Sequence, residues 1–186
     1  MSQNIFFTSD NHFGHKNIFK FCRETRHGRD VDEMNEHMIE KWNAMVTDND
    51  RVYCLGDFSF MRSDKTEDVL KRLKGQIHLI LGNHDQWLNA ATSVYFESVS
   101  HYKKITLDGI KVIMFHYPIF EWENIHYGAF HLFGHVHGSV TVPGRAMDVG
   151  IDARPQKDMG LWEWEEVKEI LSKRDIRKHH NKLGDM

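Results

Sequence analysis

Histidine, aspartate and asparagine recur in this sequence directly after short apolar stretches. In HLILGNHDQW (78–87) an apolar run is followed by Gly82 and then by Asn83, His84 and Asp85. The same arrangement is found in IFFTSDNH (5–12), VYCLGD (52–57), VIMFH (112–116) and HLFGHVHG (131–138). Carboxylate and amide oxygens combined with imidazole nitrogens, without thiolates, suit divalent ions such as manganese, iron or zinc. The pattern therefore indicates metal chemistry.

The set of candidate donors is larger than one ion requires. It consists of Asp10, His12, Asp57, Asn83, His84, His116, His135 and His137. A carboxylate can bridge two ions, so a two-metal site fits this number of donors better than a single tetrahedral ion. Taken singly each motif is weak, because Gly-Asp is usually a plain turn and His116 alone could be a core histidine. In GHVH, however, alternate residues of an extended segment point the same way, which lets His135 and His137 face one site.

Alternating strand and helix signals place these residues at strand ends. We expect strands at 5–8, 52–55 and 77–81, a short helix over 16–22, and a helix from Asp30 or Asp32 to about Val46. A further helix is expected to begin with Asp64 as its cap and to end at Gly75. Strands separated by helices in this order are typical of a parallel sheet. Side chains beyond the carboxyl ends of parallel strands meet in one place, which is where ligands bind in such sheets.

The second half of the chain is predicted to consist mainly of strands. Strands over 99–107 and 110–115 flank Asp108-Gly109, a strong hairpin signal, and others are expected at 130–133 and roughly 139–142. This half should form an antiparallel or mixed sheet, followed by a last helix over about 165–173. No repeat or linker interrupts the sequence, so we expect a single domain over 1–186. Its basic tail, at about 175–186, is expected to be flexible.

Charge and cysteine content limit the classes of function. A formal net charge of -3 over 186 residues gives no electrostatic argument for a dedicated nucleic-acid or membrane binder. The 2 cysteines cannot form a disulfide framework, and neither a signal peptide nor a long apolar span is present. We therefore expect a cytoplasmic protein with no membrane partner and no evident protein partner. An anionic substrate would need positive charge from metals or from a few basic side chains.

The motifs SDNH, GD, GNHD, H and GHVH, taken in this order from Ser9 to His137, resemble those of the calcineurin-like metallophosphoesterases, in particular small bacterial and phage members. The resemblance implies an α/β fold, a four-layer αββα sandwich with a dinuclear centre. It also implies that Asp10, His12 and His137 hold one ion, that Asn83, His116 and His135 hold the other, and that Asp57 bridges them. His84 would lie beside the scissile phosphate, and Asp85 would orient that histidine.

The same resemblance implies a metal-dependent phosphoric ester hydrolase that works through a metal-bridging hydroxide. Two divalent ions per chain would be required, with Mn²⁺ as the first choice and Fe, Zn or Ni as alternatives. The segments GDFSFM and GNHD differ from the GDxVDRG and GNHE of the superfamily's protein phosphatases, which argues against phosphoprotein substrates. We therefore expect small phosphodiesters or nucleotide phosphoesters as substrates. A nuclease acting on DNA or RNA ends, although not favoured, and an inactive scaffold that binds protein are the alternatives.

Three further residues are candidates for substrate contacts. His15 follows the first motif, and Arg23 and Arg26 lie in FCRETRHGRD, from which they could grip a phosphate. Each has an ordinary alternative, since His15 could begin a helix and solvated arginines are common on protein surfaces. The segment DVGID (148–152) either lines the site or forms a strand-end turn.

Overall fold

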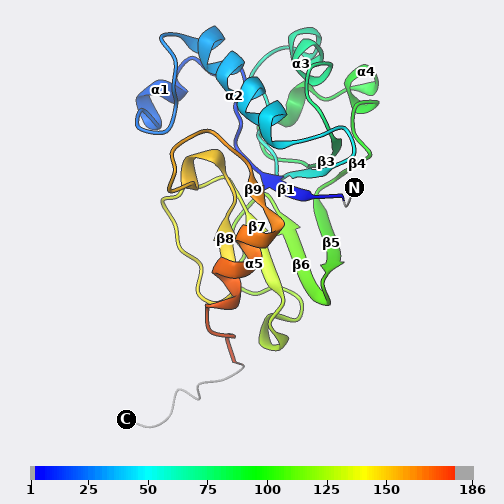
Figure 1. Ribbon diagram of the computed structural model, residues 1–186, viewed down its shortest axis with the longest axis vertical. Coiled ribbons are helices and arrows are strands. Elements are labelled where there is room, and N and C mark those ends of the chain that lie inside the picture. The colour runs from blue at the N-terminus through cyan, green and yellow to red at the C-terminus, as the bar shows by residue number, and fades with distance from the viewer. Residues whose placement is uncertain (1–2, 179–186) are drawn as a thin grey trace.

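Two β-sheets form the centre of the molecule, and helices cover the first of them (Figure 1). The structure is a computed structural model and describes residues 3–178. In chain order the elements are β1 (Ile5–Thr8), α1 (Ile18–Phe21), α2 (Val31–Met45), β2 (Arg51–Cys54), α3 (Ser63–Leu70), β3 (Gln76–Ile80), η1 (Asp85–Trp87), α4 (Ala90–Ser93), β4 (Ser98–Ser100), β5 (Tyr102–Leu107), β6 (Ile110–Phe115), η2 (Ile125–Tyr127), β7 (Phe130–Phe133), β8 (Ala146–Asp148), η3 (Ile151–Ala153), β9 (Trp162–Glu163) and α5 (Trp164–Ser172). Sheets with flanking helices are the α/β architecture that the sequence predicted.

The first sheet has the strand order β4-β3-β2-β1-β9. Strands β1 to β4 run parallel, with Phe7 opposite Tyr53 and Cys54 opposite Leu79, and β9 joins β1 in the antiparallel direction. This arrangement confirms the parallel strand-helix-strand pattern predicted for the first half. The edge strand β9 was not predicted, because two residues are too few to give a strand signal.

The second sheet is mixed, as predicted, with the order β5-β6-β7-β8. Strands β5 and β6 form the hairpin at Asp108-Gly109, while β6, β7 and β8 run parallel. Two details of the prediction were wrong. Residues 99–107 are two strands rather than one, because the chain leaves the first sheet after Ser100 and enters the second at Tyr102. Residues 139–142 form no strand, and the edge strand is β8 instead.

Successive side chains of a strand point to opposite faces of the sheet, and this divides the core into layers. Phe6 belongs to a cluster on the outer face of the first sheet that includes Met38 and Trp42 of α2, whereas Phe7 belongs to the cluster between the two sheets. Trp164 of α5 also packs in the cluster between the sheets. Figure 1 shows α1 to α4 gathered at one end of the molecule, above the first sheet. The two sheets are thus held rigidly against each other, which fixes the edges from which the polar loops emerge.

Helix α2 begins where the sequence predicts it, and α3 does not. Asp30 is the N-cap of α2, and its carboxylate accepts the backbone N–H groups of Asp32 and Glu33. The predicted cap Asp64 instead lies in the first turn of α3, and Arg62 takes the N-cap position. Aspartate is favoured both at the N-cap and in the first turn, because its negative charge is stabilised near a helix N-terminus. Residue type alone therefore does not show which of the two positions Asp64 takes.

The end of the chain lies partly outside the described residues. The basic tail predicted at 175–186 is described only as far as residue 178. Within this part, Arg177 pairs with Glu121 and lies over the ring of Phe120. Within residues 3–178, no helix is long and apolar enough to span a bilayer.

Replacing Asp30 with alanine should lower stability without altering the metal centre. The substitution leaves two N–H groups at the start of α2 without their acceptor, a loss of about 1 kcal/mol for a typical N-cap. Urea denaturation measures the change, with Asp48→Ala as the control because Asp48 is equally exposed and caps no helix of the described chain. Equal effects of the two substitutions would contradict the capping role.

Candidate metal centre

Loops that follow five strands bring the predicted donors together. Asp10 and His12 follow β1, Asp57 follows β2, Asn83 and His84 follow β3, His116 follows β6, and His135 and His137 follow β7. The strands of each group are parallel, so their carboxyl ends lie at one edge of each sheet. The two edges are joined by direct bonds, such as the one from the His135 backbone N–H to Asp10 Oδ2 at 2.8 Å.

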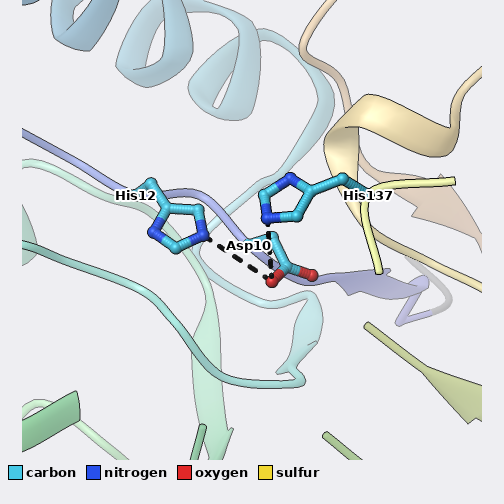
Figure 2. A group of neighbouring side chains, drawn as sticks. All are labelled: Asp10, His12 and His137. Carbon is cyan, nitrogen blue, oxygen red and sulfur yellow. Dashed lines mark ion pairs between the residues drawn. The ribbon is translucent and has the colours of Figure 1, made fainter. Parts of the chain in front are cut away.

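Asp10, His12 and His137 form the first cluster (Figure 2). Nε2 of His12 lies 3.7 Å from Asp10 Oδ1, and Nε2 of His137 lies 3.8 Å from the same oxygen. The rings of His12 and His137 are nearly parallel, with centroids 5.1 Å apart. Three donor atoms from two loops therefore face a common point.

Asp57, His116 and His135 form the second cluster. Asn83 joins it, because its Oδ1 lies 3.1 Å from His116 Nε2 and accepts a hydrogen bond from the Tyr117 hydroxyl at 3.4 Å. His116 is fully buried, whereas His135 is exposed. The second cluster is thus open to solvent on the His135 side.

Asp57 lies between the two clusters. Its Oδ2 is 3.8 Å from Nε2 of His12 and 3.6 Å from Nε2 of His116, so one oxygen faces a donor of each cluster. The other oxygen, Oδ1, accepts the backbone N–H of His84 at 2.9 Å. The arrangement leaves Oδ2 directed at the space between the clusters.

Backbone strain is concentrated at these residues. Left-handed φ angles are found at Asp10 (56°), His12 (51°), Asp57 (52°), His135 (71°) and His137 (48°). Such conformations are uncommon for residues other than glycine and persist only where the surrounding structure enforces them. The fold therefore holds five of the predicted donors in conformations that local sequence preferences do not favour.

Two glycines allow the loops to approach closely. A Cβ atom on Gly134 would lie 1.9 Å from Ser9 Oγ and 2.4 Å from Asp10 Oδ2. One on Gly82 would lie 2.3 Å from Asp57 Oδ1. Any side chain at either position would displace a site carboxylate.

Neighbouring oxygen atoms fix the orientation of two histidine rings. Nδ1 of His116 lies 2.7 Å from the Leu55 carbonyl, and Nδ1 of His137 lies 2.7 Å from Asp152 Oδ2. Because these oxygens accept hydrogen bonds, each Nδ1 carries the proton and Nε2 points into the site. Rings held in this way are typical of metal-ligating histidines.

Arg26 connects the first cluster to Asp152. The arginine is 2% exposed, and its guanidinium donates to the backbone carbonyls of Asp10 (2.6 Å) and Asn11 (2.8 Å) and to Asp152 Oδ1 (2.9 Å). The Thr25 hydroxyl also bonds to Asp152. The substrate contact predicted for Arg26 does not fit this placement, because the side chain is enclosed and its donors are engaged within the protein.

Burial and local charge shift the pKa values in the first cluster. Burial raises the pKa of Asp10 to about 6, opposed by the neighbouring His137 and His116. Burial also lowers the pKa of His12 to about 2, reinforced by His137 and Arg26. For His137, burial lowers the pKa, but hydrogen bonds with Asp152 and Cys22 and the charge of Asp10 raise it to about 10.

Asp152 and Asp148 support the loop that carries His137. Burial raises the pKa of Asp152, but its bonds to His137 and Arg26 outweigh burial and hold that pKa far below the usual range. Asp148 accepts the backbone N–H groups of Gly138 and Gly150 at 2.7 Å. Of the two alternatives for DVGID, the structure therefore favours the one in which the segment lies at the site.

Asp85 supports the loops rather than the His84 ring. Its oxygens accept the backbone N–H groups of Asp57 (2.9 Å), Phe58 (2.9 Å) and Gly82 (2.8 Å), and also the Trp87 indole N–H. Among the described residues it makes no bond to the imidazole of His84, so the predicted orienting contact is not formed. The carboxylate instead ties the loop after β2 to the loop after β3.

His84 and His15 lie next to the exposed ring of Phe60. Nε2 of His84 is 4.0 Å from Asp57 Oδ2, and 43% of its side chain is exposed. Phe60 stacks on His15 with centroids 3.9 Å apart and contacts His84 at 4.4 Å and His12 at 5.1 Å. His15 is therefore close to the first cluster, whereas Arg23 is exposed and lies over Phe19, so the substrate roles of both stay predictions.

The first cluster leaves buried donor atoms for a cation. Asp10 Oδ1 and both ring nitrogens of His12 are buried and have no hydrogen-bond partner within residues 3–178. Buried polar atoms of this kind are costly unless something satisfies them. A carboxylate and imidazoles aimed at one point match the donor chemistry of a divalent ion, so the residues fit a metal.

Sequence reasoning missed Phe60, Tyr117 and Cys22, and it misplaced Arg26. Cys22 Sγ lies 3.6 Å from His137 Nδ1, a contact between residues 115 positions apart. Nothing in the residue types marks such a contact, since it depends on how the α1–α2 segment lies over the β7–β8 loop. A buried arginine is also rare enough that its type alone predicts exposure.

Comparison with known proteins shows the family of this chain and two relatives. A family model described as the calcineurin-like phosphoesterase superfamily domain matches residues 4–145. The uncharacterized protein MJ1445 of Methanocaldococcus jannaschii is 33% identical over 137 residues, or 73% of this chain and 70% of that protein. The Gene 66 protein of Mycobacterium phage L5 is 29% identical over 186 residues, covering 81% of this chain and 87% of the phage protein.

A solved structure shares the fold. The protein of unknown function AQ665 from Aquifex aeolicus superposes with a TM-score of 0.68 at 22% identity, covering 91% of this chain and 100% of its own. At this level of identity the likeness concerns the fold alone.

Arg26→Met should destabilise the protein strongly. The substitution leaves Asp152 buried without its guanidinium partner, and breaking such a pair typically costs about 3–5 kcal/mol. Arg29→Met is the matched control, because Arg29 lies in the same segment with its side chain 89% exposed, where an ion pair contributes about 1 kcal/mol or less. Urea denaturation measures the free energy of unfolding of both variants. Similar losses of stability in the two would mean that the Arg26 network does not support the site.

Proposed function

The chain belongs to the calcineurin-like phosphoesterase superfamily and is a metal-dependent phosphoester hydrolase, and from this premise we propose that it cleaves small phosphodiesters or nucleotide phosphoesters at a dinuclear centre. The observation that carries the dinuclear proposal is the position of Asp57, whose Oδ2 faces His12 of one cluster and His116 of the other. A carboxylate in this position suits a bridge between two cations.

The donor atoms divide between two ions. In this proposal the first ion is held by Asp10, His12 and His137, the second by Asn83, His116 and His135, and Asp57 is shared. The close approach of Asn83 Oδ1 to His116 Nε2, at 3.1 Å, supports the second set, because both atoms carry lone pairs that a cation can accept. We propose Mn²⁺ as the native metal, with Fe, Zn and Ni as the alternatives that the same donors accept.

The protein's own groups position the phosphate and supply a proton. When bound, two divalent ions would neutralise phosphate charge and increase the acidity of a water molecule, so that hydroxide is available near neutral pH. The imidazoles keep the site from becoming too anionic to accept a phosphate. His84 lies at the open side of the site, where its Nε2 donates a proton to the leaving oxygen. Its backbone bond to Asp57 Oδ1 holds it at that place.

Small substrates fit the surroundings of the site. The chain lacks the Asp-Arg pair that marks the protein phosphatases of the superfamily, having GDFSFM at 56–61. Its net charge of -3 does not favour the long basic groove that a nuclease needs to hold a nucleic-acid chain. Both observations support compact phosphoesters over phosphoproteins and duplex DNA.

Asp57→Asn should abolish hydrolysis and lower metal binding. The wild type loaded with Mn²⁺ is expected to cleave bis-p-nitrophenyl phosphate and to bind two ions per chain. The variant keeps the shape of the side chain but loses the charge shared by both ions, so activity should fall by about 10³-fold or more, as for loss of a central electrostatic group. Metal content by mass spectrometry and titration calorimetry gives a readout that is independent of turnover.

Asp48→Asn is the matched control, since it removes an exposed carboxylate that precedes β2, whereas Asp57 follows the other end of that strand. It should retain both ions and full activity. A wild type that binds one ion tightly, together with a fully active Asp57→Asn variant, would refute the dinuclear proposal.

His84→Asn should distinguish a general acid from a structural residue. If His84 protonates the leaving oxygen, the variant keeps both ions and loses about 10²–10⁴-fold in kcat on esters of poor alkoxide leaving groups. It should lose far less on nitrophenyl esters, because nitrophenolate departs without a proton. An equal loss on both ester types, or loss of an ion, would show that His84 is not the acid.

A further inference from the structure

A cavity of about 790 Å³ opens beside the candidate metal centre. It is lined by residues at the start of α3 and by residues of η1 and α4. Figure 1 shows α3 and α4 as neighbours at one side of the molecule. Phe60 and His84 belong both to its wall and to the surroundings of the centre. Glu67 and Ala91 lie further along the cavity, on α3 and α4. Its volume is in the range of small-molecule binding sites.

The position of His84 relates this cavity to the reaction. Its Nε2 lies 4.0 Å from Asp57 Oδ2, while its ring also lines the cavity. Hydrolysis breaks the P–O bond to the leaving group, places the water oxygen on phosphorus and delivers one proton to the leaving oxygen. Because His84 is proposed above to supply that proton, the group attached to the leaving oxygen extends on the His84 side of the phosphate, which is the side of the cavity.

The wall of the cavity combines aromatic rings with uncharged amides. Phe60 is 41% exposed and offers a ring beside His84, and the largely buried Trp87 also contributes to the wall. Gln86 is exposed, and within the described chain its amide makes no hydrogen bond. Asn89 uses its Oδ1 to cap α4, which leaves its NH₂ group as a donor. These groups suit a ring that carries hydroxyl groups.

The charges on the wall disfavour a second anionic group. Asp64 and Glu67 contribute two carboxylates, and each is paired. Asp64 lies 3.6 Å from the Arg62 guanidinium, and Glu67 lies 2.9 Å from the Lys71 ammonium. Glu67 also accepts the Tyr95 hydroxyl at 3.1 Å. Both cations beside the wall, Arg62 and Lys71, are therefore already engaged with carboxylates. An additional phosphate would have to compete with these carboxylates for Arg62 or Lys71, whereas hydroxyl groups would find acceptors.

We propose that this cavity binds the leaving group of the substrate and that this group is an uncharged, hydroxyl-bearing ring, either the nucleoside of a nucleotide or the sugar of a sugar phosphate. The inference rests on the proposed function for the identity of the reacting phosphate. It narrows the substrate class, because the leaving groups of polyphosphates and the continuing strand of a nucleic acid carry further phosphates to a wall where Arg62 and Lys71 are already paired with carboxylates.

Binding of a free leaving group tests the cavity without relying on turnover. Titration calorimetry of adenosine, and separately of glucose, into the Mn²⁺-loaded full-length protein measures occupancy and distinguishes the two sources of the ring. Ala91→Trp, which fills the cavity from an exposed position, should weaken binding of whichever ligand binds by about tenfold or more, equivalent to about 1.4 kcal/mol. Gln86→Ala should weaken it by about threefold to tenfold through loss of one hydrogen bond.

Ala90→Trp is the matched control, because Ala90 is an exposed residue of the same short helix and is not part of the cavity wall. It should leave both ligand binding and hydrolysis of bis-p-nitrophenyl phosphate unchanged. Binding that is equally strong in the wild type and Ala91→Trp, or no binding of either ligand, overturns the cavity assignment. Failure of the wild type to hydrolyse bis-p-nitrophenyl phosphate, with adenosine still bound, would instead overturn the proposed function alone.

Discussion

The centre depends on carboxylates that use one oxygen to hold a loop and leave the other free. Asp10 accepts the His135 backbone N–H through Oδ2, while its Oδ1 faces two imidazoles and has no hydrogen bond within the described chain. Asp57 accepts the His84 backbone N–H through Oδ1 and presents Oδ2 between the clusters. Because each bond crosses from one loop to another, the same contact that assembles the loops also aims a negative charge at the site. A cation then completes the arrangement, since buried charge without a partner is strongly unfavourable.

Groups behind the donors offset the strain of this assembly. Left-handed backbone at residues such as His12 and His137 costs free energy, and it persists because neighbouring contacts determine the loop shape. Arg26 binds the carbonyls of the first loop and the Asp152 carboxylate, and Asp85 collects N–H groups from two loops. Arg26, between α1 and α2, thus holds the loop that follows β1, and Asp85 of η1 holds the loops that follow β2 and β3.

The sequence predicted which residues the loops bring together, because the physical rule behind their placement is simple. Polar residues at the carboxyl ends of parallel strands meet at one edge, and strands such as β1 and β3 could be recognised from their apolar runs. The supporting contacts could not be predicted, since Arg26 and Asp152 are 126 positions apart and their pairing depends on tertiary packing. Residues 99–107 were read as one strand for a similar reason, because a change of sheet after Ser100 leaves the apolar pattern almost unbroken.

The candidate metal donors and most of the wall of the proposed cavity come from different parts of the fold, although His84 and η1 belong to both. The donors are attached to strand ends and tied to each other across both sheets, so their positions are set by the core and tolerate little change. The cavity wall comes mainly from the loop before α3 and from η1 and α4, short elements at the surface whose side chains, such as Gln86, make few internal contacts. Substitutions of exposed wall residues such as Gln86 and Ala91, which make no side-chain hydrogen bond within the described chain, can alter the cavity while Asp85 still holds the backbone of Asp57. A fold arranged in this way can keep one hydrolytic reaction and exchange its leaving groups, because only surface loops need to change.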